Sequence, residues 1–168
     1  MDYSNMKSED MLPVVKELNI LLAEYHMYYQ KLRNFHWNIL GKNFFDLHIK
    51  FEELYEDARV KIDDIAERIL TLRYHPLSRY SEYLEVSEIK EEKSSLPDHE
   101  MVDILLQDHK LLLKRMKSVI DQSDKAGDEG TIDLIGAYIR ELEKASWMLN
   151  VWTKKTDDQL KTIPLSEY

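Results

Sequence analysis

The chain has 168 residues, no cysteine and a formal net charge of −9, from 23 lysine and arginine against 32 aspartate and glutamate residues. This length fits one domain over 1–168, and the missing cysteine excludes a disulfide scaffold, a thiol nucleophile, a zinc ribbon and an iron–sulfur cluster. The acidic balance makes nucleic acid a poor default partner, because such a surface repels phosphates and attracts cations.

The two ends of the sequence carry neither a basic tether nor a membrane segment. Residues 1–10 hold one lysine against three acids, and the tail from residue 153 onward offsets three lysines with three acids. No apolar run approaches the roughly eighteen residues that a membrane span needs. We therefore expect a soluble, cytoplasmic protein that binds neither DNA nor membranes.

The first helix is predicted to begin near Ser8 or Glu9 and to end around Gly41. Its larger side chains recur at steps of three and four, which is typical of a helix with one buried face. This seam consists of Val15, Leu18, Leu22, Tyr25, Tyr29, Leu32 and His36.

A second helix is predicted to follow, with Asn43 as its N-cap and Asp46 in its first turn. Pro76 is expected to end it. Its seam again alternates steps of four and three, and consists of Leu47, Phe51, Leu54, Ala58, Ile62, Ile65 and Ile69.

Residues 77–97 form a long connection with one short helix candidate around Ser78 to Leu84. Asp98 is predicted to cap a third helix, and after the AGDEG break a fourth runs from about Thr131 to Trp152. The fold class is therefore all-α: a ferritin-like four-helix bundle with a short extra helix in the long connection between helices two and three. The third helix carries Leu105, Leu106, Leu112, Leu113, Met116 and Ile120 on its apolar face.

The second helix also carries a polar stripe away from its seam. It contains two pairs of side chains at i, i+4 spacing, His48/Glu52 and Asp63/Glu67, and each pair can bind one metal ion. Glu52 and Asp63 stand about 16 Å apart along the axis at ~1.5 Å per residue, so one helix cannot close both couples on one metal. Packing the helix antiparallel on its copy about a two-fold axis would create two equivalent mixed sites.

Such sites, with His36 added, offer nitrogen and oxygen ligands that suit iron or manganese and that zinc also tolerates. The spacing alone leaves simpler interpretations open. The stripe can be an ordinary solvated face, His36 a hydrogen-bonded core histidine, and Trp37 a packing residue. The other histidines, at 26, 75, 99 and 109, indicate only solvent or capping roles.

The stretch HWNILGKNFFDLHIKFEELYEDARVKIDDIAERI, residues 36–69, resembles the signature of the Dps mini-ferritins. The matching features are His-Trp-Asn, the Gly and Phe of the bend, a second His twelve residues after the first, then Asp and Ala-Glu-Arg. A weaker likeness covers GDEGTIDLIGAYIRELEKASWML, residues 127–149.

This resemblance implies a set of functional positions. The ferroxidase ligands fall on His36, His48, Asp63 and Glu67, with Glu52 where the family usually has Asp, and Trp37 matches an aromatic residue thought to transfer electrons. Glu53 matches an acid implicated in mineral nucleation, Ile49 replaces another such acid, and Glu56 is a possible substitute. Asp128 and Asp133 match acids that line three-fold pores, although both can equally serve as helix-terminal caps.

The resemblance also implies a function. The protein is expected to form a homododecamer built from two-fold dimers, to bind two irons per inter-subunit site, and to oxidise Fe(II) with hydrogen peroxide or oxygen. It would then store Fe(III) mineral and protect against oxidative damage as a ferroxidase. The alternatives are a structural DNA-compacting protein, as some relatives with basic tails are, and a shell that only sequesters metal.

Overall fold

The computed structural model describes residues 7–154 and 160–167, which are helices joined by loops. Four long helices form a bundle, and one short helix lies in the connection between the second and third of them, as the sequence predicts. The elements in chain order are η1 Ser8–Met11, α1 Leu12–Asn38, α2 Phe44–Thr71, α3 Tyr80–Val86, α4 Asp98–Ala126, α5 Glu129–Trp152 and η2 Leu165–Glu167.

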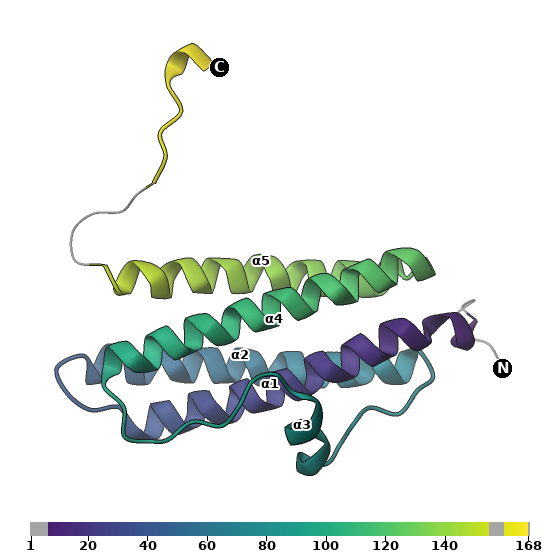
Figure 1. Ribbon diagram of the computed structural model, residues 1–168, viewed down its shortest axis with the longest axis horizontal. Coiled ribbons are helices and arrows are strands. Elements are labelled where there is room, and N and C mark those ends of the chain that lie inside the picture. The colour runs from purple at the N-terminus through teal and green to yellow at the C-terminus, as the bar shows by residue number, and fades with distance from the viewer. Residues whose placement is uncertain (1–6, 155–159, 168) are drawn as a thin grey trace.

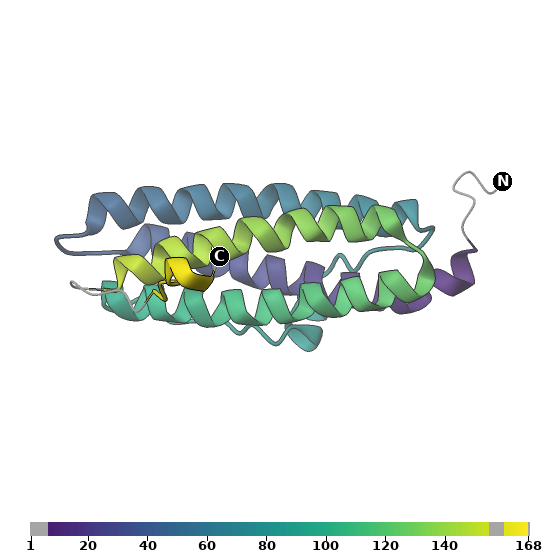
Figure 2. The same cartoon turned by 90° about the horizontal axis from the view of Figure 1, so that it is seen from above.

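Two helical hairpins make up the bundle. The α1/α2 hairpin packs beside the α4/α5 hairpin, and the connection after α2 runs back along the bundle so that α3 lies against α1 (Figures 1 and 2). A long crossover of this kind, between two tight hairpins, is the ferritin-like variant of the four-helix bundle. The tight bend between α1 and α2 brings the end of α1 and the start of α2 together at one end of the molecule.

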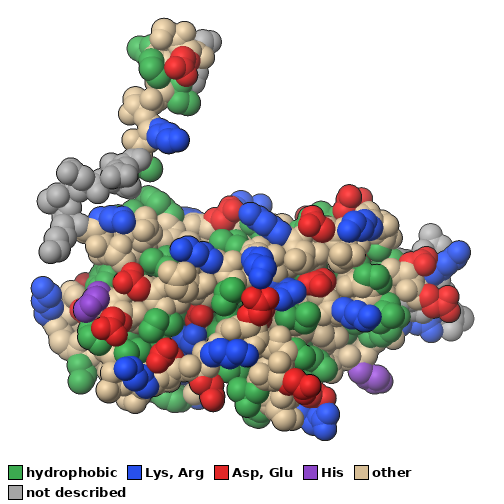
Figure 3. Space-filling model, in the orientation of Figure 1, with side chains coloured by type: hydrophobic (Ala, Val, Ile, Leu, Met, Phe, Trp, Pro, Cys, Tyr) green, Lys and Arg blue, Asp and Glu red, His purple; other side chains and the backbone are tan. Residues whose placement is uncertain are grey.

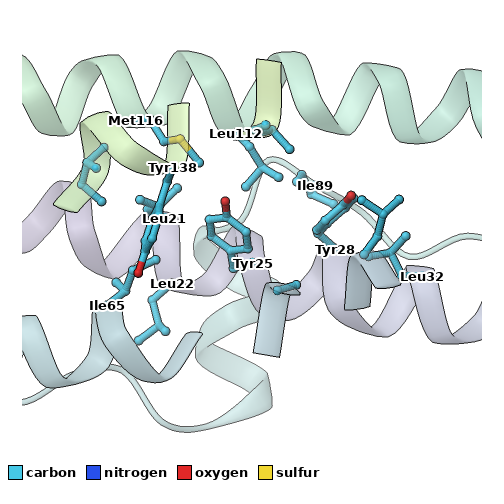
Figure 4. Close-up of a cluster of buried hydrophobic side chains, with 14 of the residues drawn as sticks. Leu21, Leu22, Tyr25, Tyr28, Leu32, Ile65, Ile89, Leu112, Met116 and Tyr138 are labelled. Atoms are coloured by element: carbon cyan, nitrogen blue, oxygen red, sulfur yellow. The ribbon is translucent and has the colours of Figure 1, made fainter. Parts of the chain in front are cut away.

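The predicted seams form the core. Every member of the α2 seam is buried except Ile62, which is half-buried, and the α1 seam is buried except for half-buried Tyr29. Figure 4 shows part of this core, in which α1 supplies several large side chains, among them Tyr25 and Tyr28. Polar atoms on buried rings usually have hydrogen-bond partners inside the bundle.

The end of α2 differs from the prediction. The helix ends at Thr71, five residues before Pro76, because Arg73 adopts a left-handed conformation with φ 72°. In that conformation the Arg73 and Tyr74 amides donate to the carbonyls of Leu70 and Ile69, which satisfies two terminal carbonyl groups. Pro76 therefore follows the stop and does not cause it.

Two predicted caps are also wrong in their details. Asn43 is the N-cap residue of α2, but its side-chain amide donates to the Asp98 carboxylate (2.6 Å) and does not cap the helix. Asp98 is the first residue of α4, whose N-cap is Pro97. The two side chains instead join the starts of α2 and α4, a long-range contact that local sequence signals do not reveal.

Candidate metal centre

His36 and His48 meet at the closed end of the α1/α2 hairpin. His36 lies in the last turn of α1 and His48 at the fifth position of α2, and their rings stack with centroids 3.7 Å apart and planes 18° apart. The five-residue bend between the helices contains Gly41, whose φ of 102° favours glycine. The bend thus brings together two histidines that are twelve residues apart in sequence.

Each imidazole donates a hydrogen bond to the backbone of the other residue. Nδ1 of His36 lies 2.7 Å from the His48 carbonyl oxygen, and Nδ1 of His48 lies 2.8 Å from the His36 carbonyl oxygen. A carbonyl oxygen only accepts, so both Nδ1 atoms carry protons, and in the neutral form of each ring the lone pair is on Nε2. This is the tautomer and orientation that second-shell hydrogen bonds give to metal-binding histidines.

Aromatic rings fix the histidine pair from two sides. Phe44 stacks on His48 at 4.8 Å between centroids, and Tyr55 meets His36 at a right angle at 5.4 Å. His36 is 8% exposed, whereas His48 is half-buried. Packing of this kind restricts both imidazoles to one orientation, as a preorganised ligand pair requires.

The three carboxylates of the α2 stripe are all exposed. Glu52 lies one turn from His48, while Asp63 and Glu67 lie about four and about five turns from His48, toward the other end of α2. Within residues 7–154 and 160–167, no three ligating side chains gather closely enough to hold one ion. The single chain therefore brings the two histidines together and leaves Asp63 and Glu67 apart from them.

Trp37 lies next to His36 but faces another direction. Its ring is 57% exposed and lies on the wall of a cleft of about 350 Å³ between α1, α3 and residues 91–92. The Arg33 guanidinium lies 4.7 Å from the centre of the indole, a cation–π contact. In the single chain the indole therefore lies outside the hydrophobic core.

The candidate nucleation acids lie exposed on α2. Lys50 donates to Glu53 at 2.8 Å, and Arg59 donates to Glu56 at 2.9 Å. Pairs at this exposure are weak and are screened by salt, so both carboxylates remain accessible to cations. Ile49, where the resembling family often has an acid, is 55% exposed on the same helix.

Asp128 and Asp133 differ in their surroundings. Asp128 is the N-cap of α5 and is buried, and it accepts hydrogen bonds from the Thr131 amide (3.1 Å), the Thr131 hydroxyl (2.6 Å) and the Arg68 guanidinium. Its capping interpretation is confirmed, and its carboxylate is already occupied within the chain. Asp133 is exposed, so it alone of the two presents its carboxylate to solvent.

The buried polar groups inside the bundle were not predicted. His109, expected to have a solvent or capping role, is 1% exposed and hydrogen-bonded, and Lys31 forms a buried ion pair with Asp108. Leu105 and Leu112 place residues 108 and 109 on the buried face of α4, so the helical period already contained this signal. Glu24 is also buried, 1% exposed, on α1.

Comparisons with known proteins agree with this architecture. A family model for the ferritin-like domain matches residues 15–158. The chain is 38% identical over 155 residues to the DNA protection during starvation protein of Porphyromonas gingivalis, a match that covers 92% of this chain and 98% of that protein.

Solved structures agree as well. The DPS protein of Vibrio cholerae O1, described as a member of a broad superfamily of ferritin-like diiron-carboxylate proteins, superposes with a TM-score of 0.86 at 42% identity, covering 89% of this chain and 94% of that one. A Dps protein from Bacillus brevis gives a TM-score of 0.85 at 40% identity, covering 89% of this chain and all of that one.

Proposed function

The chain belongs to the Dps family of ferritin-like proteins, and from that membership we propose that it is a ferroxidase that oxidises Fe(II) and stores the Fe(III) product. The observation that carries the proposal is the reciprocal pairing of His36 and His48, which leaves two preoriented Nε2 lone pairs side by side. Two buried or half-buried imidazoles with this arrangement are suited to bind a transition-metal ion.

The ligand set is completed across a two-fold axis between two copies of the chain. His36, His48 and Glu52 of one subunit face Asp63 and Glu67 of the partner subunit when the two α2 helices pack antiparallel. The separation of the two half-sites within one chain supports this arrangement. Six such dimers form a hollow shell of twelve subunits, in which each dimer contributes two sites and each site binds two irons.

The imidazoles and the carboxylates have different roles in the reaction. The imidazoles bind Fe(II) through Nε2, and the anionic carboxylates favour the Fe(III) product because they offset its higher charge. Two Fe(II) ions held together give up two electrons, which is what one molecule of hydrogen peroxide needs to become two hydroxide ions. Removing both iron and peroxide in one reaction limits oxidative damage. Hydrogen peroxide is our preferred oxidant, with oxygen as the second.

The remaining positions have supporting roles in this proposal. Glu52 carries one methylene more than the usual Asp of the family, so it reaches about 1.5 Å further and is suited to bind or bridge the second iron. Trp37 donates electrons beside the site, and Glu53 and Glu56 initiate the mineral inside the cavity. Asp133 guides Fe(II) through the shell, while Asp128 holds the start of α5 in place.

We also propose that residues 1–168 act as one domain and that the protein works in the cytoplasm. Within the residues that the structure describes, every helix is too short or too polar to cross a lipid bilayer. Apart from the iron and the oxidant, the partner is a second copy of the chain.

A structural DNA-binding function is the second candidate, because relatives bear names that speak of DNA protection during starvation. Removing iron and peroxide protects DNA without contact, so the names fit both functions. Acidic and basic side chains are interleaved on the face in Figure 3, and a formal charge of −9 disfavours phosphate binding. We therefore place iron oxidation first.

The test is the rate of Fe(II) oxidation by peroxide, followed by the absorbance of the ferric product. His48→Ala should abolish the rapid oxidation of Fe(II) and weaken Co(II) binding at the site. His75 is an exposed histidine in the connection after α2, so His75→Ala should change neither. Equal rates in assembled wild-type and His48→Ala protein would overturn the proposal.

A further inference from the structure

A hydrogen-bonded tyrosine–histidine pair lies inside the bundle, away from the candidate metal centre. The Tyr28 hydroxyl on α1 lies 2.7 Å from Nε2 of His109 on α4, and the two side chains are 2% and 1% exposed. Their rings meet edge to face at 5.4 Å between centroids. Figure 4 shows the Tyr28 hydroxyl directed from α1 toward α4.

The protons of this pair can be assigned from its partners. The Ser146 hydroxyl donates to the Leu142 carbonyl oxygen (2.6 Å), so its oxygen accepts from Nδ1 of His109 at 2.7 Å. His109 therefore carries its proton on Nδ1, and its Nε2 accepts the hydrogen bond that Tyr28 donates. The phenol thus points its proton at a free base.

The other buried tyrosines have different surroundings. The Tyr25 ring lies 6.3 Å from Tyr28, yet its hydroxyl has no hydrogen-bond partner among the described residues. Tyr138 donates to the Asp64 carboxylate at 2.7 Å, and Tyr83 donates to a backbone carbonyl. Among the buried tyrosines of the described ranges, Tyr28 is the one bonded to an imidazole.

We propose that Tyr28 and His109 form a proton-coupled one-electron redox site in the bundle core. When Tyr28 loses one electron, the O–H bond breaks and its proton forms a bond with Nε2 of His109, which leaves a neutral phenoxyl radical and an imidazolium. A hydroxyl radical is the oxidant: it takes the electron and one solvent proton and becomes water. Fe(II) then returns one electron, the proton moves back to Tyr28, and Fe(III) results.

The electrostatics of the site favour coupled transfer over simple ionisation. Burial, with a smaller contribution from Asp108, raises the pKa of Tyr28 well above its ordinary value, so a buried phenolate is disfavoured. Burial lowers the pKa of His109 to about 4, so its ring is neutral and free to accept a proton at neutral pH. The positive charge formed on His109 lies at the cleft that His109, Ser146 and Trp147 line.

This role rests on the proposed function, which supplies both the oxidant and the reductant. Hydroxyl radical arises when one Fe(II) ion meets peroxide alone, a leak that a two-iron site reduces but does not eliminate. Tyr28 and His36 lie on one helix, eight residues or about 12 Å apart along its axis. The Tyr28 radical would persist inside the bundle until a further Fe(II) ion reduces it.

The first experiment uses iron-free protein, so that its result does not depend on ferroxidase activity. Sulfate radicals from flash-photolysed persulfate oxidise the protein, and electron paramagnetic resonance follows the tyrosyl radical. The long-lived signal should be lost in Tyr28→Phe and retained in Tyr25→Phe, the matched control with an equally buried but unpartnered hydroxyl. His109→Gln should keep a hydrogen-bond acceptor and lose the long lifetime.

Wild-type protein provides a measurement that no substitution can disturb. High-field spectra should show a radical oxygen that accepts a hydrogen bond, and the radical should form more slowly in D₂O. An unchanged signal in Tyr28→Phe, a signal lost instead in Tyr138→Phe, or a radical without a hydrogen bond would each overturn the assignment.

A second experiment separates this inference from the proposed function. Wild-type protein is mixed with Fe(II) and peroxide, and the same radical should appear and then decay as more Fe(II) is added. A radical in the iron-free experiment without Fe(II) oxidation would overturn the ferroxidase proposal and keep the redox pair. Fe(II) oxidation with no Tyr28 radical in either experiment would overturn the pair alone.

Discussion

Lys31 on α1 and Asp108 on α4 form an ion pair inside the bundle, with Nζ 2.7 Å and 2.9 Å from the two carboxylate oxygens and side chains 5% and 6% exposed. Burial raises the pKa of Asp108, and the nearby Lys31 ammonium opposes that rise. Each charge is therefore tolerated only because the other is present, which makes the pair a sensitive point for stability.

Removing one partner of this pair should destabilise the fold strongly. Lys31→Met leaves the Asp108 carboxylate buried without its counter-ion, and we expect a loss of about 3–5 kcal/mol in the free energy of unfolding. The double variant Lys31→Met/Asp108→Leu should recover most of the loss. Urea unfolding at one protein concentration measures both, since oligomers unfold in a concentration-dependent way.

The exposed pair Lys50–Glu53 is the control for this measurement, because Lys50→Met should cost less than about 1 kcal/mol. If Lys31→Met were as mild as Lys50→Met, the buried pair would contribute nothing to stability and our interpretation would be wrong.

Glu24 should make stability depend on pH between about 4.5 and 7. Burial raises the pKa of Glu24 to about 7, Arg115 opposes this rise, and Glu88 adds to it. A raised folded-state pKa means that the folded chain holds the proton more tightly, so the stabilisation is complete below the unfolded value and is lost as pH rises through 7. Between pH 5 and pH 8, wild type should lose up to about 3 kcal/mol relative to Glu24→Gln.

The control for Glu24 is Glu17, which accepts a hydrogen bond from the same Arg115 at 2.8 Å but is partly exposed. Glu17→Gln should keep the wild-type pH profile of unfolding because Glu24 is still present. Parallel profiles for wild type and Glu24→Gln would contradict the prediction.

Periodic packing was predictable from the sequence, and long-range polar contacts were not. The α2 seam is right because an apolar residue every three or four positions must face the core whatever its partners are. The stop at Arg73 was missed because it depends on a left-handed backbone at a residue that rarely adopts it. The Asn43–Asp98 bond was missed because its partners are 55 residues apart.

In the candidate site, too, the residues were predictable from the sequence and their long-range hydrogen bonds were not. The resemblance predicts His36 and His48 as candidate ligands, but no sequence pattern predicts that each ring donates to the other residue's carbonyl oxygen. That arrangement depends on how tightly the bend closes. For Asp128 the sequence allowed a cap or a pore role, and the cap became clear only from the hydrogen bonds that Thr131 and Arg68 donate to its carboxylate.

DNA binding provides a further prediction. Because the surface is acidic overall, we expect no gel retardation of duplex DNA at physiological salt and neutral pH without divalent bridging ions. The measurement is a salt titration with the full-length protein. Tight binding that weakens steeply as salt is added would reveal a basic surface and would favour the structural function.

Asp133→Asn should slow Fe(II) oxidation at limiting iron and leave assembly intact, because the exposed carboxylate attracts cations along their route. Asp103→Asn, an exposed acid on α4, is the matched control and should have no such effect. Asp128→Asn should act differently and lower stability by about 1 kcal/mol or more, since it weakens the cap of α5. Initial rates that do not change with Asp133→Asn at any ionic strength would exclude the pore role.

Shared sites lead to a prediction about mixed assemblies. His48→Ala and Asp63→Ala subunits should each be inactive in pure form, because every site then lacks one ligand. Each site takes His48 from one subunit and Asp63 from the other. In a dimer that contains one subunit of each variant, one site therefore has both substitutions and the other has neither. Random reassembly makes about half of the dimers mixed, so on the order of a quarter of all sites should be intact.

Co-refolded His48→Ala and Asp63→Ala proteins should therefore regain ferroxidase activity that neither has alone, up to about a quarter of the wild-type rate. Mass spectrometry of intact assemblies establishes that the subunits have mixed, and a blend of the two proteins without refolding is the control. Sites built within one chain predict no recovery at any ratio, since every subunit would carry its own lesion. No recovery in assemblies proven to be mixed would therefore exclude a site shared across the two-fold axis, whatever the histidine pair binds.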